Sequence, residues 1–260
     1  MKSFFKIAIL CMAAIAGLRM SAGEVIDIDT PQMRIFLPDD DKNNGRVVII
    51  CPGGSYLGHA FEHEGTQWSE LFNEHGITAV VLRYTLPNGD RNRPIADVYK
   101  AMDIIRSNAE AWKVNPDDIG IMGSSAGGHL ASTIATHSPA EYTPTFQILF
   151  YPVISMEQPL THKVSHDNFL GADSNAALDA EYTNYRKVNA TTPRAIIFFS
   201  GDDTVVTVMN GVEYFQALNE AGVPASLHIY PTGHHGWGYN KSFEYHDEVV
   251  KELSAWLKSF

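Results

Sequence analysis

The chain has 260 residues, of which 45% are hydrophobic and 19% charged, a composition typical of a globular protein with a large core. Its formal net charge of −11 argues against a nucleic-acid or anionic-membrane partner and favours a neutral or cationic substrate. Because α/β folds of this length often remain undivided, we expect a single folded domain over residues 23–260.

The first 22 residues have the pattern of a secretory signal peptide. Lys2 and Lys6 precede an apolar run over residues 7–18 that is too short to span a bilayer, and small residues follow up to Ala22. We expect cleavage after Ala22, export to the periplasm or exterior of a bacterial cell, and no membrane association afterwards. Cleavage would leave Cys51 as the sole cysteine, so no disulfide is expected within the chain.

Short apolar segments alternate with helical patterns from residue 46 onward. Strands are expected at residues 47–50, 79–82, 119–122, 148–151, 195–199 and 226–230, with antiparallel edge strands around 28–36. Helices are expected at residues 66–74, 95–111, 126–136, 208–221 and 246–259. This alternation predicts an α/β fold, with a mostly parallel sheet covered by helices on both faces and reactive groups in the loops that follow strands. Residues 155–192 break the pattern and predict an insertion over the site.

The most informative motif is GSSAG at residues 123–127, which matches G-x-S-x-G. An apolar strand pattern precedes it and a helical pattern follows, which is the setting of a nucleophile elbow. The turn from strand to helix is so sharp that side chains beside the nucleophile would collide, and Gly123 and Gly127 avoid this collision. The motif therefore predicts an exposed, nucleophilic hydroxyl on Ser125.

A serine nucleophile needs a base, and the base needs an acid to orient it. The loop after the strand at 195–199 contains Asp202 and Asp203, and the loop after the strand at 226–230 contains His234 and His235. This gives the order Ser, acid, His that the fold class uses. We assign Asp203 because it directly precedes an apolar run, and His235 because a glycine and a tryptophan follow it.

Backbone amides are expected to hold the oxyanion of the tetrahedral intermediate. One is the N–H of Ala126, the residue after the nucleophile. The other is expected from the glycine-rich loop after the strand at 47–50, with Gly54 and Ser55 as the donors.

The chain resembles a known family in five motifs. They occur in the expected order between residues 45 and 260: CPGGSY followed by Glu64 and Gly65, LRYTLP, NPDDIGIMGSSAGGHLA, GDDTVV and GHHGWG. They are similar to those of bacterial carbohydrate esterases of the α/β-hydrolase fold, and within these to acetylxylan esterase-like proteins. The resemblance implies Ser125 as nucleophile, Asp203 as acid and His235 as base. The chain departs from the family at Ser55 and His234, where relatives often carry glycine.

The resemblance implies a secreted serine esterase that removes acetyl groups from a plant polysaccharide such as xylan, through an acyl-enzyme and without a cofactor. The expected partner is therefore an acetylated polysaccharide or oligosaccharide. Tyr56 and Trp237 adjoin the oxyanion loop and the base, so we expect them to line the pocket. The same machinery would also suit a feruloyl esterase, a general carboxylesterase or a peptidase-like hydrolase.

A metal-dependent hydrolase is the alternative of a different class. His59, Glu62 and His63 match the H-x-x-E-H spacing of inverted zinc peptidases, and a helix would place both imidazoles on one face. Gly58 and Gly65 bracket the segment and disfavour such a helix, and the sequence offers no third ligand. We therefore expect no metal.

Overall fold

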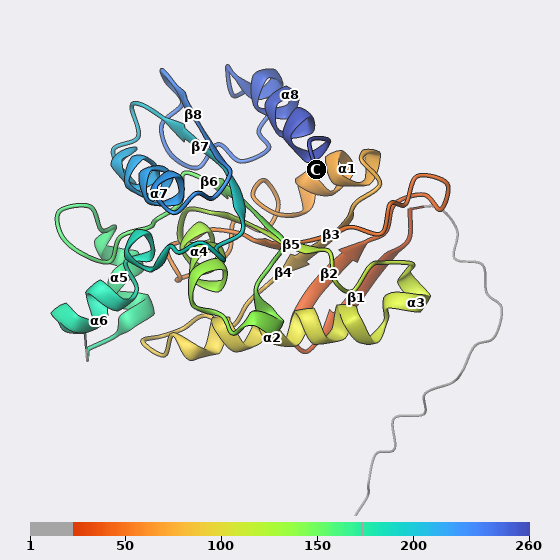
Figure 1. The fold of residues 1–260 in the computed structure, drawn as a ribbon, viewed down its shortest axis with the longest axis horizontal. Helices are drawn as coiled ribbons and strands as arrows, with labels where there is room; N and C mark the ends of the chain where they lie inside the picture. Colours follow the sequence, from red (N-terminus) through yellow and green to blue (C-terminus); the bar gives the residue numbers. More distant parts are fainter. Residues whose placement is uncertain (1–22, 173) are drawn as a thin grey trace, which may run out of the picture.

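The computed structural model describes residues 23–172 and 174–260, so the predicted signal peptide lies outside the described residues. One eight-stranded sheet crosses the molecule in the order β1-β2-β4-β3-β5-β6-β7-β8 (Figure 1). The pairs β1·β2 and β2·β4 are antiparallel, and every other pair is parallel. The strands are β1 (Val25–Asp29), β2 (Gln32–Phe36), β3 (Val47–Cys51), β4 (Thr78–Leu82), β5 (Ile119–Ser124), β6 (Phe146–Phe150), β7 (Arg194–Ser200) and β8 (Ala225–Tyr230).

Helices cover both faces of this sheet. In Figure 1, α1 and α8 lie on one face, and α2, α4 and α7 lie on the other. The helices are α1 (Ser69–Glu74), α2 (Asn92–Ser107), α3 (Ala109–Trp112), α4 (Ser125–His137), α5 (Lys163–Leu170), α6 (Ala176–Glu181), α7 (Met209–Glu220) and α8 (His246–Leu257), with the short 3-10 helices η1 (Thr66–Trp68), η2 (Ala140–Tyr142) and η3 (Asn184–Lys187). Helices on both faces explain why β3, β4, β5 and β6 are apolar without alternation and buried along their whole length.

The predicted elements are present, with shifts that have local causes. β6 ends at Phe150, one residue earlier than expected, because Tyr151 has a left-handed backbone with φ of 34°. The helix expected at 95–111 is divided into α2 and α3 at Asn108, whose side-chain amide donates to the carbonyl of Ile104. The described residues of the segment 155–192 contain α5, α6 and η3 but no strand, as expected for an insertion.

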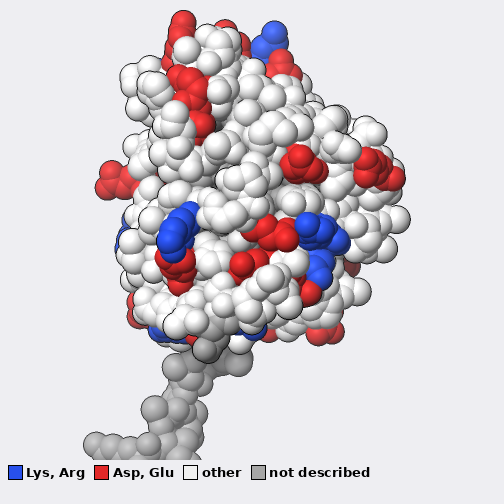
Figure 2. Space-filling view, turned by 90° about the vertical axis from the view of Figure 1, so that its left-hand side faces the viewer, with Lys and Arg blue, Asp and Glu red and all other residues white. Residues whose placement is uncertain are grey.

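The parallel strands all point the same way, so the loops after β3, β5, β6, β7 and β8 meet at one edge of the sheet. The face shown in Figure 2 carries its Lys and Arg side chains as isolated groups among acidic and uncharged residues. Among the described residues, no helix combines the length and the apolar character that a bilayer crossing requires.

Candidate active site

Ser125 stands at the sharp turn between β5 and α4. Its backbone is left-handed, with φ of 52°, and it opens the helix directly after the strand. A Cβ on Gly123 would lie 2.2 Å from the carbonyl oxygen of Gly127, and one on Gly127 would lie 2.0 Å from that of Cys51. The turn therefore requires glycine at both positions, which is the close approach that the G-x-S-x-G motif predicts.

The structure brings together Ser125, at the start of α4, Asp203, in the loop after β7, and His235, in the loop after β8. Nε2 of His235 lies 2.8 Å from Oγ of Ser125, and Nδ1 of His235 lies 2.7 Å from Oδ2 of Asp203. Because a carboxylate accepts hydrogen bonds, Nδ1 carries the ring hydrogen and Nε2 is free to accept the hydroxyl proton of Ser125. The arrangement can therefore convert a serine hydroxyl into a nucleophile.

Asp203 is held rigidly in its orienting position. Its side chain is fully buried, and its Oδ1 accepts the backbone N–H groups of Val205 and Val206, each at 2.9 Å. Oδ2 remains for the imidazole. These two amides fix the carboxylate and offset the cost of burying its charge.

The neighbouring Asp202 and His234 form a separate surface pair. Oδ1 of Asp202 accepts the backbone N–H of His234 at 2.9 Å, and Oδ2 lies 3.2 Å from the His234 ring. The side chain of His234 is 83% exposed. The structure thus places Asp203 and His235 at Ser125 and leaves their sequence neighbours at the surface.

The oxyanion loop after β3 has an unusual backbone. Gly54, Ser55 and Tyr56 all have positive φ values, of 133°, 57° and 59°. Within the described chain, no hydrogen bond engages the N–H of Gly54 or Ser55. The N–H of Ala126 lies in the first turn of α4, where a helix leaves its amides without intrahelical acceptors. These three amides have the availability that oxyanion donors need.

Glu64 is a residue of the site to which the sequence assigned no role. It is only 3% exposed, and its two carboxylate oxygens accept from the amide of Gly53 and from the hydroxyl of Tyr151, each at 2.8 Å. The Tyr151 oxygen in turn accepts the amide of Gly238 at 2.7 Å. Burial and then the charge of Glu64 raise the pKa of Tyr151 well above its ordinary value, so the phenol keeps its proton and donates it.

This chain of hydrogen bonds joins the oxyanion loop to the loop that contains His235. The ring of Tyr151 also packs edge-on against that of His235, with centroids 4.8 Å apart. Glu64 stands in the sequence beside Gly65, within the stretch that follows the oxyanion loop. Its sequence signal is an acid next to a glycine in that stretch, but its partner Tyr151 lies 87 residues away in the chain.

The predicted insertion contacts the site from above the strand ends. The side-chain amide of Asn168, on α5, donates to the carbonyl oxygen of Ser55 at 3.1 Å. His162 lies just before α5. Burial lowers its pKa, the proximity of His235 lowers it further, and Asp203 opposes the shift. The insertion therefore supports the oxyanion loop and places an imidazole near the reacting groups.

Tyr56 and Trp237 do not line an open pocket. Tyr56 is fully buried, its hydroxyl lies 3.0 Å from Nδ1 of His129, and its ring stacks on Phe169. Trp237 is 5% exposed, donates its indole N–H to Oγ of Ser200 and stacks on Phe243. Because this packing leaves no ring face for a sugar, it does not support the prediction that the two side chains bind substrate.

The segment with the zinc-peptidase spacing does not have the geometry of that motif. Residues 61–65 form turns rather than a helix. The ring of His59 packs edge-on against that of Tyr84 with centroids 4.5 Å apart, and burial lowers its pKa. The described residues contain no group of three or more His, Cys, Asp or Glu side chains placed to hold a metal ion. The helical arrangement on which the metal hypothesis depends is therefore wrong.

The fold and this set of side chains define an α/β hydrolase with a Ser–His–Asp arrangement at the carboxyl edge of its sheet. Residues 48–238 match the family described as having the alpha/beta hydrolase fold, and the chain belongs to that family. The predicted fold class is thereby confirmed.

Individual relatives are consistent with the resemblance in the sequence. The chain is 45% identical over 232 residues to an acetylxylan esterase of Xylanibacter ruminicola. The aligned residues make up 88% of this chain and 48% of that protein. It is 31% identical over 224 residues to endo-1,4-beta-xylanase B of Butyrivibrio fibrisolvens, covering 79% of this chain and 34% of the relative. The chain thus spans about half or less of these two proteins.

A solved structure gives the same result for the fold. The acetyl ester-xyloside bifunctional hydrolase from Caldicellulosiruptor lactoaceticus superposes with a TM-score of 0.83 at 29% identity, covering 93% of this chain and 97% of that one. These relatives confirm the predicted resemblance to acetylxylan esterase-like proteins. They also support the predicted enzyme class, a carboxylic ester hydrolase.

Proposed function

We propose that this protein is a serine esterase that releases acetyl groups from acetylated plant polysaccharide such as xylan. The observation that carries the proposal is the pair of hydrogen bonds that connects Asp203, His235 and Ser125, at 2.7 and 2.8 Å. They lie beside the amides of Gly54 and Ser55, which donate no hydrogen bond within the described chain. The names of its relatives, an acetylxylan esterase and an acetyl ester-xyloside hydrolase, support the choice of substrate.

The reaction follows from this geometry. Oγ of Ser125 attacks the ester carbonyl carbon while Nε2 of His235 takes the hydroxyl proton, and the amides of Gly54, Ser55 and Ala126 hold the resulting oxyanion. When the intermediate collapses, the bond to the sugar oxygen breaks and His235 returns the proton to that oxygen. A water molecule, deprotonated by His235, then attacks the carbonyl carbon of the acetyl-serine ester. As the bond between this carbon and Oγ of Ser125 breaks, His235 returns the proton to Oγ, and acetate is released.

The neighbours of the acid and the base provide matched controls for the first prediction. We expect Ser125→Ala, His235→Ala and Asp203→Asn to lower kcat by about 10⁴-fold or more, because each removes one member of a cooperating set. We expect His234→Ala and Asp202→Asn to retain most of the activity. Acetate release from acetylated xylan is the measurement. The assignment of the base fails if His234→Ala is inactive while His235→Ala turns over.

A substrate panel tests the acyl specificity. Wild type and Ser125→Ala are compared on acetylated xylan, methyl ferulate and an aminoacyl amide. We expect wild type to prefer the acetylated polysaccharide and Ser125→Ala to hydrolyse none of the three. A preference for methyl ferulate or for the amide would show a feruloyl or peptidase-like specificity on the same machinery.

We also propose that the protein is exported, with residues 1–22 as the signal and residues 23–260 as the catalytic domain. The basic residues and the apolar run before Ala22 support this. Mass spectrometry of the N-terminus after expression in a bacterial host tests it, and an intact N-terminus on a cytoplasmic protein would contradict it.

A further inference from the structure

The proposed reaction places a requirement on the position of the sugar. Nε2 of His235 has to deliver a proton to the oxygen that leaves, and that oxygen belongs to the sugar. The sugar must therefore lie within hydrogen-bond reach of His235, beside the loop that carries it. The following inference rests on the proposed function and extends it from the acetyl group to the rest of the polysaccharide.

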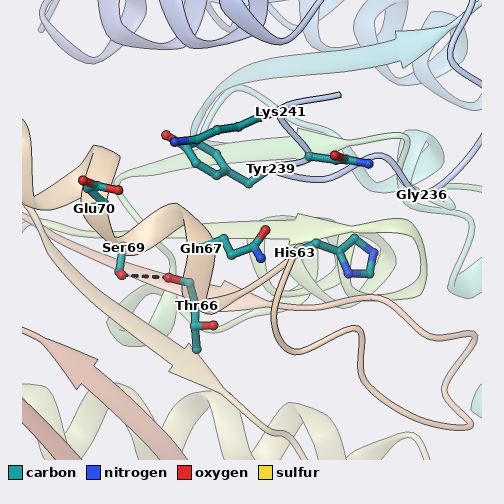
Figure 3. A pocket seen from close by; sticks show the side chains of 9 residues that line it. His63, Thr66, Gln67, Ser69, Glu70, Gly236, Tyr239 and Lys241 are labelled. Carbon is teal, nitrogen blue, oxygen red and sulfur yellow. Dashed lines mark hydrogen bonds between the residues drawn. The ribbon is translucent and has the colours of Figure 1, made fainter. Parts of the chain in front are cut away.

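A cavity of about 700 Å³ opens beside this loop (Figure 3). One wall is formed by Gly236, the residue after His235, and by Tyr239 and Lys241. The opposite wall includes His63, Gln67 and Glu70, on the segment that leads from the oxyanion loop into α1. The volume lies in the range of ordinary ligand sites.

The two walls are joined at the end near the catalytic histidine. The carbonyl oxygen of His63 accepts the N–H of Tyr239 at 2.7 Å. Figure 3 places Gly236 and His63 at one end of the cavity and Glu70 at the other. Gly236 has φ of 82°, and a Cβ there would meet no atom within 4 Å, so the backbone next to His235 borders open space. The cavity therefore adjoins the residue that directly follows His235.

The side chains in the cavity are suited to a neutral sugar. Gln67, Glu70 and Lys241 are exposed, and within the described residues no side-chain hydrogen bond or ion pair engages them. Together they offer both donors and acceptors, which sugar hydroxyls require. Tyr239 adds a half-buried ring that is braced by Trp68 and His246, with centroids 4.9 Å from each. Among the lining residues, Glu70 carries a negative charge and Lys241 a positive one, so the two charges balance. In a chain of net charge −11, this lining disfavours a strongly anionic ligand.

We propose that this cavity is a binding subsite for the unacetylated sugar units next to the one that carries the ester, with a neutral xylo-oligosaccharide as its ligand. Gln67, Glu70 and Lys241 hydrogen-bond the hydroxyls, and Tyr239 presents an apolar face to a sugar ring. The acetyl group itself is held at Ser125, outside this cavity.

Direct binding tests the subsite without depending on turnover. Calorimetric titration of the Ser125→Ala protein with unacetylated xylotetraose is compared with that of Ser125→Ala/Gln67→Trp, in which the indole fills the cavity. We expect Kd to rise at least about tenfold in the double variant, and to stay unchanged in Ser125→Ala/Gln216→Trp, which places the same bulk on exposed α7. Equal binding by the first two proteins, or no binding to Ser125→Ala at millimolar xylotetraose, overturns the proposal.

A milder pair of substitutions keeps the test valid if the tryptophan disturbs folding. Gln67→Ala/Lys241→Ala removes donors and acceptors at exposed positions and leaves Tyr239 in place. We expect its kcat/KM to fall about tenfold more on acetylated xylotetraose than on p-nitrophenyl acetate, which has no sugar to bind. The exposed pair Lys100→Ala/Gln216→Ala is the control. An equal fall on both substrates, or none on either, contradicts the subsite.

These measurements separate the subsite from the proposed function. Xylotetraose binding that depends on Gln67, without acetate release from acetylated xylan, retains the subsite and rejects the acetylxylan esterase activity. Acetate release that is insensitive to the cavity variants retains the activity and rejects the subsite.

Discussion

Glu64 shows how a single buried carboxylate connects the loop after β3 with the loop that contains His235. It accepts the amide of Gly53, which precedes the two proposed oxyanion donors of the loop, and the hydroxyl of Tyr151, which packs on the ring of His235. The Gly53 amide is thus engaged, and the remaining amides of the loop stay available for the substrate. A Cβ on Gly53 would lie 2.6 Å from the Glu64 carboxylate, so this residue has no room for a side chain.

We predict that Glu64→Gln lowers kcat more than it changes KM. The two donors are bound by different oxygens of the Glu64 carboxylate, and glutamine replaces one of these oxygens with an NH2 group. The donor at that position, the Gly53 amide or the Tyr151 hydroxyl, therefore loses its acceptor in a buried site. We expect the free energy of unfolding to fall by about 1–3 kcal/mol and kcat to fall about tenfold or more, measured by urea unfolding and by p-nitrophenyl acetate hydrolysis. Glu62→Gln, two residues earlier and exposed, is the matched control. A Glu64→Gln enzyme with wild-type kcat would contradict the positioning role.

At the scale of elements, the site depends on how closely α4 packs against the end of β3. The contact is made by Gly127. A Cβ added at this residue would lie 2.0 Å from the carbonyl oxygen of Cys51 and 2.5 Å from that of Pro52. Both neighbours are backbone atoms of the strand end and the oxyanion loop, which cannot move independently of the site. The last glycine of the G-x-S-x-G motif therefore sets the spacing between Ser125 and the loop after β3.

We predict that Gly127→Ala destabilises the protein and impairs catalysis together. The added methyl group has to separate α4 from β3, at a cost of about 1–3 kcal/mol typical of overpacked cores. The same displacement moves Ser125 relative to the amides of Gly54 and Ser55, so kcat should fall as well. Thermal unfolding and acetate release measure the two effects. Gly58→Ala is the control, because a Cβ at Gly58 meets nothing within 4 Å. Equal stability of the two variants would contradict the packing argument.

At the scale of the whole molecule, many histidine side chains are partly or fully buried, which favours their neutral form. Burial is the main cause, and it lowers the pKa of His59, His75, His129, His137, His162, His228 and His246. His129, in α4, is the extreme case, with a pKa lowered to about 3. Its Nε2 donates to the carbonyl oxygen of Tyr182, and its Nδ1 accepts from the hydroxyl of Tyr56. Protonation would remove that acceptor and bury a charge.

We predict that the protein loses stability as the pH falls below about 6.5, the ordinary pKa of histidine in an unfolded chain. Between that value and the lowered folded pKa, the unfolded state binds more protons, so acid favours unfolding. For His129 alone the loss at pH 5 is about 2 kcal/mol relative to pH 7.5. Urea unfolding at the two pH values measures it.

His129→Gln isolates this contribution, because a glutamine amide can accept from Tyr56 and donate to Tyr182 without titrating. We expect this variant to reduce the difference in unfolding free energy between the two pH values by about 2 kcal/mol. His234→Gln, at an 83% exposed side chain, should leave the difference unchanged. Equal acid sensitivity of wild type and His129→Gln would reject the assignment.

The sequence predicts much of this protein because its main signals are local. Buried strands are continuous apolar runs, and the nucleophile elbow requires a serine between glycines where a strand meets a helix. The loop that carries Asp203 follows such a strand, β7, and the loop that carries His235 follows the half-buried edge strand β8. The fold class and the candidate members of the site could therefore be predicted from short segments. The boundaries that shifted, at Tyr151 and Asn108, depend on single backbone conformations that apolar periodicity does not report.

Burial of individual side chains was decided by the tertiary structure. Tyr56 and Trp237 adjoin the reactive loops in sequence, but the neighbouring elements enclose both rings. Glu64 obtains its role from Tyr151, 87 residues away, and the cavity beside His235 forms where residues before α1 meet the loop after β8. The sequence by itself determined the fold class and the candidate reactive groups, because periodicity and turn chemistry depend on neighbouring residues. Only the tertiary structure decided which polar groups pair and where space remains, because these depend on contacts between segments far apart in the chain.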